Sequence, residues 1–130
     1  MTTSGGGLEF ESFVAAGDLS TKKHYFMKLS ADRTVTTCAA VTDKPIGVLY
    51  NKPAAAGRAA QIAVEGRVEI VAGGTVAAGD KVGTHSDGTV VAYVPGTDTT
   101  KYIVGMCVVG AASGEIAVCD IDCAAAGRGA

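Results

Sequence analysis

The chain lacks several features that would link it to sugars, nucleic acids or membrane surfaces. It contains no tryptophan, and aromatic residues make up only 5% of its 130 residues. Stacking platforms for sugar rings are therefore scarce, which argues against a carbohydrate-binding surface. The formal net charge of -2 supplies no basic field to attract phosphate backbones or an anionic bilayer. We expect neither nucleic acid nor a membrane as a partner.

Long apolar segments are also missing. The longest apolar run, from Tyr102 to Ala112, is far shorter than the roughly 20 residues that cross a bilayer. The opening Met-Thr-Thr-Ser-Gly-Gly-Gly has neither the charged nor the apolar region of a signal peptide. The sequence therefore predicts a soluble protein that is made without a signal peptide.

The residue patterns do not support catalysis. The segment Thr84–Asp87 contains His, Ser and Asp, but neighbours on an extended chain point apart, whereas the members of a catalytic triad converge from separate elements. His24 and His85 lack a nearby ligand at metal-binding spacing, and Asp120 with Asp122 offers too few oxygens for calcium. We expect no enzyme activity, no cofactor and no metal site.

Cysteines are present but form no recognisable motif. They are too sparse for a disulfide scaffold, so we expect them to be reduced and mostly buried. If Tyr102–Val109 and Glu115–Ile121 form a hairpin, Cys107 and Cys119 lie nearly opposite each other, and the sequence leaves open whether they bond. The four positions are Cys38, Cys107, Cys119 and Cys123.

Glycine, in contrast, is abundant. The 18 glycines are about twice the average usage, and with many Ala, Val and Thr residues they favour short strands joined by tight turns. The clearest strand is Gln61–Val71, where Ile62, Val64, Val68 and Ile70 alternate with polar residues. A slip of one residue would expose all four aliphatic side chains, so this pattern fixes the register of the strand.

Other segments show similar short patterns bounded by turns. Ile46–Tyr50 is apolar on both faces and is predicted to be a central strand, while Asp87–Gly88 signals a hairpin. The fold predicted is all-β, a small barrel or sandwich of about seven or eight short strands. Besides Gln61–Val71 and Ile46–Tyr50, the predicted strands are Lys22–Leu29, Val35–Val41, Lys81–Thr84, Thr89–Val94, Tyr102–Val109 and Glu115–Ile121.

The length accommodates one domain with its own core. We predict that residues 14–123 form this β-rich domain. Residues 1–13 are predicted to be a flexible N-terminal arm, and residues 124–130 a frayed C-terminal tail.

A succession of short motifs extends over residues 8–122. The most specific is Pro45-Ile46-Gly47-Val48-Leu49-Tyr50-Asn51-Lys52-Pro53, and the others are Ala16–Ser20, Tyr25–Leu29, Ala72–Gly74, Ala77–Asp80, Tyr102–Cys107 and Ala111–Ile116. In these motifs the chain resembles the capsid decoration, or cement, proteins of tailed phages. The resemblance implies a structural protein, made in the host cytoplasm, that binds the outer surface of an icosahedral head and bridges major capsid protein subunits. It also favours self-association, for instance as a trimer.

Two sets of residues are predicted to dock on the capsid or on a sister subunit. The first is Leu8, Phe10 and Phe13, with the arm adding a strand to an exposed sheet edge; alternatively, the same residues pack on the domain's own core. The second set follows a buried strand, and its alternative is an ordinary turn. It consists of Tyr50, Asn51, Lys52 and Pro53.

Two other functions fit a small, turn-rich β-domain. A carrier domain of the biotinyl or lipoyl type needs a lysine exposed on a hairpin tip, and Lys52 and Lys81 are the candidates. Neither lysine has the hydrophobic flanks that such a hairpin normally shows. A sugar-binding surface appendage is the other alternative, against which the low aromatic content argues.

Overall fold

The computed structural model describes residues 8–98, 100–125 and 127–128. These residues form an all-β fold with one short 3-10 helix, which confirms the predicted fold class. The elements are β1 Glu9–Ala15, β2 Phe26–Ala31, β3 Thr34–Thr37, β4 Gly47–Leu49, β5 Ala59–Val71, β6 Lys81–Thr84, β7 Val90–Ala92, β8 Tyr102–Ile103, β9 Gly105–Val109, β10 Ile116–Asp122, η1 Cys123–Ala125 and β11 Gly127–Arg128.

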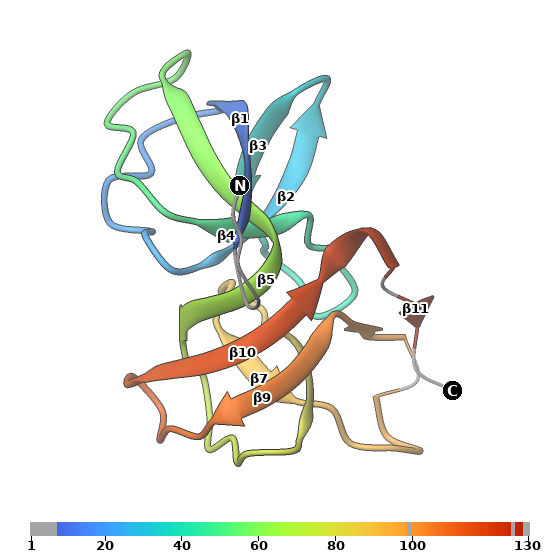
Figure 1. The fold of residues 1–130 in the computed structure, drawn as a ribbon. Helices are drawn as coiled ribbons and strands as arrows, with labels where there is room; N and C mark the ends of the chain where they lie inside the picture. The colour runs from blue at the N-terminus through green and yellow to red at the C-terminus, as the bar shows by residue number, and fades with distance from the viewer. Residues whose placement is uncertain (1–7, 99, 126, 129–130) are drawn as a thin grey trace.

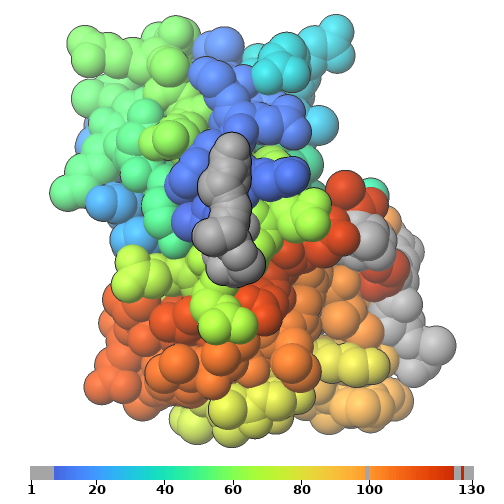
Figure 2. Space-filling model, in the orientation of Figure 1, coloured from blue at the N-terminus to red at the C-terminus, as the bar shows by residue number. Residues whose placement is uncertain are grey.

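The long strand β5 connects two halves of the molecule (Figure 1). Its first part pairs with β1 and β4, and its last part pairs with β10. The strand bends between the two parts at Gly66, whose φ of 115° lies in a region that favours glycine. In Figure 2 the halves are in contact, with the blue-to-green segments above the orange and red ones.

Nine strands form one sheet in the order β1-β3-β2-β4-β5-β10-β9-β6-β7. Because β1 also pairs with β5, the pairings of the first five strands run in a ring. The sheet as a whole is not a closed barrel; it is sandwich-like, so the sandwich is the better of the two predicted architectures. The backbone N–H of Phe26 donates to the carbonyl of Gly88 at 2.7 Å, which joins β2 to the turn between β6 and β7.

Strand β4 is buried on both faces. Consecutive residues such as Val48 and Leu49 belong to different core clusters, because alternate side chains of a strand point to opposite faces. The prediction that Ile46–Tyr50 is a central strand is therefore confirmed. The side chains at Ile62 and Ile70 also lie in different clusters, since the bend at Gly66 divides the apolar face that the sequence predicts as continuous.

The described residues contain eleven strands, more than the seven or eight predicted. One reason is that the predicted strand Tyr102–Val109 is interrupted. Strand β8 pairs with β11, whereas β9 pairs with β6 and β10. That segment is also less buried than its sequence suggests, because Met106 and Val109 are about half exposed. Strand β2 begins later than predicted, at Phe26, because residues 22–25 form a turn with His24 at a positive φ of 70°.

Both ends of the predicted domain extend further than expected. Residues 9–13 of the predicted arm lie in β1 and pair with β5. The backbone groups of this segment are therefore paired with a distant strand, which no local sequence pattern identifies. Residues 1–7 lie outside the described residues. In the predicted tail, η1 includes residues 124–125, and β11 pairs with β8 through Gly127 and Arg128. No helix in the described parts of the chain is long and apolar enough to span a bilayer.

Gly47 is predicted to be essential for the close approach of β4 to β5. A Cβ at this position would overlap the carbonyl oxygen of Ala63 and lie 2.5 Å from Cγ2 of Ile62. Gly47→Ala should therefore lower the free energy of unfolding by about 1–3 kcal/mol, measured by urea denaturation. The control Gly17→Ala adds a methyl group where nothing lies within 4 Å and should change stability by no more than about 0.5 kcal/mol. Equal stability of the two variants would contradict this account of Gly47.

Candidate functional site

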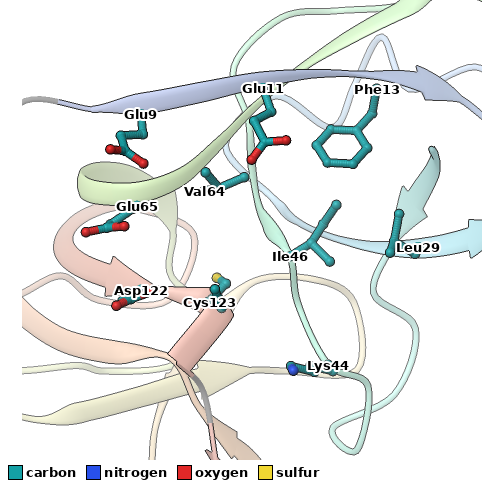
Figure 3. Close-up of a pocket in the computed structure, with 11 residues that line it drawn as sticks. Glu9, Glu11, Phe13, Leu29, Lys44, Ile46, Val64, Glu65, Asp122 and Cys123 are labelled. Atoms are coloured by element: carbon teal, nitrogen blue, oxygen red, sulfur yellow. The ribbon is translucent and has the colours of Figure 1, made fainter. Parts of the chain in front are cut away.

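A groove of about 390 Å³ lies between the two halves of the molecule (Figure 3). Strands β1, β2 and β5, the segment before β4, and the end of β10 with η1 all contribute to it. Its lining residues are Glu9, Glu11, Phe13, Leu29, Lys44, Ile46, Val64, Glu65, Asp122, Cys123 and Ala124.

Three of the carboxylates lie along one side of this groove, three apolar side chains lie on the other, and Glu11 lies between Val64 and Phe13 (Figure 3). Glu9, Glu65 and Asp122 follow one another along one side, whereas Phe13, Leu29 and Ile46 lie opposite (Figure 3). The row of carboxylates follows from strand register. Glu65 is the residue of β5 that faces Glu9 of β1 on one side and Asp122 of β10 on the other.

The three docking residues predicted in the N-terminal arm differ in how far they are buried. Leu8 and Phe13 are partly buried, and each packs against one of the two core clusters. The guanidinium of Arg33 also lies 4.8 Å from the centre of the Phe13 ring. Phe10 is different, because 41% of its surface is exposed. Of these three residues, Phe10 is the one that offers a large apolar side chain to a partner.

Tyr50 brings the two predicted docking sets together. Its ring packs edge-on against Phe10, with the ring centres 5.4 Å apart, and similarly against His24 at 5.0 Å. The hydroxyl of Tyr50 accepts a hydrogen bond from the backbone N–H of Glu69 at 2.7 Å. These contacts hold the ring of Phe10 against a fixed aromatic neighbour.

Burial and the charge of Lys23 lower the pKa of His24, so its ring favours the neutral form.

The next three residues of the second predicted set have mainly internal contacts. The side chain of Asn51 donates to the carbonyl of Ala59 at 3.0 Å and accepts from the N–H of Gln61 at 2.9 Å. Pro53 is buried, and its carbonyl accepts from the N–H of Leu19. Lys52 is exposed. Asn51 and Pro53 therefore stabilise the loop between β4 and β5, and Lys52 alone among the three faces solvent.

The acidic side of the groove was missed by sequence reasoning. In the sequence, Glu65 belongs to the polar residues of the strand Gln61–Val71, and Glu9 belongs to the predicted N-terminal arm. Asp122 was interpreted as part of a solvated strand end. The signal that unites them is register across three strands, which requires knowing that β1 and β10 flank β5. In the part of the chain that the structure describes, no group of three His, Cys, Asp or Glu side chains is arranged to hold a metal ion.

Comparison with known proteins identifies the family of the chain. A sequence profile described as phage cement protein matches residues 3–121. The chain belongs to the phage cement protein family. It is therefore a structural virion protein that associates with the outside of the phage capsid, as the motifs in residues 8–122 predicted. No curated protein sequence matches this cement protein significantly.

A solved structure shares the fold of the cement protein. It is the crystal structure of the head fiber gp8.5 N base in bacteriophage phi29, with a TM-score of 0.65. The two proteins are 20% identical, and the alignment covers 90% of the cement protein and 96% of the other chain. At this identity the similarity establishes a common fold.

All four cysteines of the cement protein are unbonded and buried. Cys107 and Cys119 are register partners across β9 and β10, which confirms their predicted proximity. The thiol of Cys107 donates to the carbonyl of Val109 at 3.3 Å. Burial raises the pKa of Cys38, Cys119 and Cys123 to about 12 in each case.

We predict that these thiols are unreactive in the native protein. For Cys38, Cys119 and Cys123, a pKa of about 12 leaves about one thiol in ten thousand ionised at pH 8, and only the thiolate attacks a disulfide reagent. Cys107 is fully buried, so a reagent in solution does not reach it. Titration with a chromogenic aromatic disulfide should therefore detect no fast-reacting thiol in the folded protein, and all four once guanidinium is added. Rapid labelling without denaturant would contradict the burial of these groups.

The role of Asn51 is predicted to be structural. Asn51→Ala removes both hydrogen bonds to the start of β5 and should lower the free energy of unfolding by about 1–2 kcal/mol, measured by chemical denaturation. Lys52→Ala, on the adjacent exposed residue, is the control and should change stability by no more than about 0.5 kcal/mol. A neutral Asn51→Ala variant would show that the loop holds its shape without this side chain.

Proposed function

We propose that this cement protein binds the outer surface of an icosahedral phage head and bridges neighbouring major capsid protein subunits. The observation that carries the proposal is the family match, which extends over residues 3–121 and so includes strands β1 to β9 and nearly all of β10. The phi29 protein of similar fold is the base of a head fibre. A fold that serves as such a base is suited to a position on the outside of a head.

The exposed face of β1 is the docking surface that we favour. Phe10 and Val14 are 41% and 40% exposed and lie on the same face of the strand, because residues four apart in a strand point the same way. Strand β3 pairs with β1 only at Val14 and Ala15, so the earlier residues of β1 have a strand partner on one side, β5. Such an edge is suited to strand addition by a partner chain.

The proposed mechanism is stabilisation by linkage. A protein that binds the assembled lattice and not its separated subunits shifts the equilibrium away from disassembly. If the cement protein self-associates as a trimer over a threefold axis, several modest contacts act together and the residence time becomes long. No reactive side chain is required, so the proposed role is non-enzymatic and its partner is the major capsid protein.

Co-sedimentation with capsids of the matching phage tests this function. We expect saturable binding with a copy number set by the symmetry of the lattice, and a higher temperature of capsid disruption when the sites are filled. Phe10→Ala should weaken binding by about tenfold or more, because it removes a large apolar side chain from the docking face. Val94→Ala, at a residue that is 50% exposed in the other half, is the matched control.

Two results would contradict the proposal. Absence of wild-type binding to mature heads would exclude the decoration role. Wild-type affinity of Phe10→Ala would exclude the exposed face of β1 as the docking surface, while leaving the decoration role intact.

A further inference from the structure

The carboxylates along the groove come from neighbouring positions in the sheet. Glu65 lies directly across from Glu9 in one neighbouring strand and from Asp122 in the other, so three like charges stand in a row across β1, β5 and β10. Like charges directly opposite each other in a sheet are destabilising. Glu11 adds a fourth carboxylate to the same groove.

Among the described residues, no ion pair engages these carboxylates. The ion pairs found there join Lys28 to Asp43, Arg67 to Asp120 and Lys101 to Asp98, none of which lines the groove. Lys44 is the basic residue among the lining residues, and its ammonium lies 5.9 Å from the centre of the Tyr102 ring. With four carboxylates against one ammonium, the lining residues carry an excess of negative charge that a cation from outside can balance.

The opposite side of the groove is suited to an apolar side chain. Phe13, Ile46 and Val64 are partly buried against a core cluster, and Leu29 beside them is 50% exposed. A volume of about 390 Å³ falls within the range of sites that enclose a ligand. A partner with a positive charge beside an apolar group would match both sides of the groove.

We propose that this groove binds an extended segment of the major capsid protein that carries a Lys or Arg next to an apolar side chain. The cation lies against Glu9, Glu65 and Asp122, and the apolar side chain lies against Phe13 and Ile46 (Figure 3). This inference rests on the proposed function and names the chemistry of its partner. Charge complementarity then supplies specificity and a salt-dependent association rate.

The N-terminal segment of a second copy is not a suitable occupant. Residues 1–7 contain no Lys or Arg, so this segment of a neighbouring copy brings no cationic side chain to the groove. Near the other end, the backbone of Arg128 is paired with β8 in β11. A segment of the capsid protein is for these reasons a better candidate than a terminal segment of a second copy.

The test compares two double variants that remove the same charge. Glu9→Gln with Glu65→Gln neutralises two members of the row, while Asp18→Asn with Asp32→Asn neutralises two exposed carboxylates that do not line the groove. For each protein, capsid affinity is measured by co-sedimentation between low and high salt. Melting temperature and the mass in solution are measured in parallel.

The groove variant should bind capsids about tenfold more weakly at low salt than the wild type, and its affinity should depend less on salt. Its melting temperature should equal or exceed that of the wild type, because the repulsion in the row is relieved. The control variant should bind like the wild type. Weaker binding combined with equal or higher stability is the result that a merely structural role of these carboxylates does not produce.

Other outcomes would overturn the inference. Unchanged affinity and salt dependence of the groove variant would exclude the groove as a capsid contact, while wild-type binding would keep the proposed function. A lower melting temperature would show that the carboxylates stabilise the fold. A change in solution mass would identify a second copy as the occupant. Failure of the wild type to bind capsids would instead reject the proposed function itself.

Discussion

The fold depends on the bend of β5 at Gly66. A straight strand would extend one sheet in one plane, whereas the positive φ of this glycine lets a single strand begin in one half of the molecule and end in the other. Strands β1 and β4 use the first part of β5, and β10 uses the last part. The two core clusters and the groove between the halves all follow from this change of direction.

The sequence predicted well wherever a signal is local. The alternation in Gln61–Val71, the apolar run around Val48 and the Asp87–Gly88 turn each determine a strand or turn from side-chain period or backbone freedom alone. The role of β1 was not predictable in this way. Its residues Glu9–Ala15 carry no buried face of their own except at the end, so their place in the sheet depends on a partner strand far along the chain.

The candidate site shows the same division. Phe10 and Tyr50 belong to the two docking sets predicted from the sequence, and the structure adds their contact. Asn51 and Lys52 looked alike as polar turn residues, yet Asn51 has two backbone partners in β5 and Lys52 faces solvent. The carboxylate row could not be predicted from the sequence, because Glu9, Glu65 and Asp122 come from three separate strands. Register between strands is a property of the folded chain.

The pairing of β1 with β5 has a consequence for how the protein is made. Glu9 leaves the ribosome 56 positions ahead of Glu65, and a contact of such long range forms only after an entropically costly loop has closed. Until then the segment that becomes β1 is not paired with β5, and Phe10 has no aromatic neighbour to pack against. The docking face that we propose on β1 therefore forms only after β5 has been made and has paired with it.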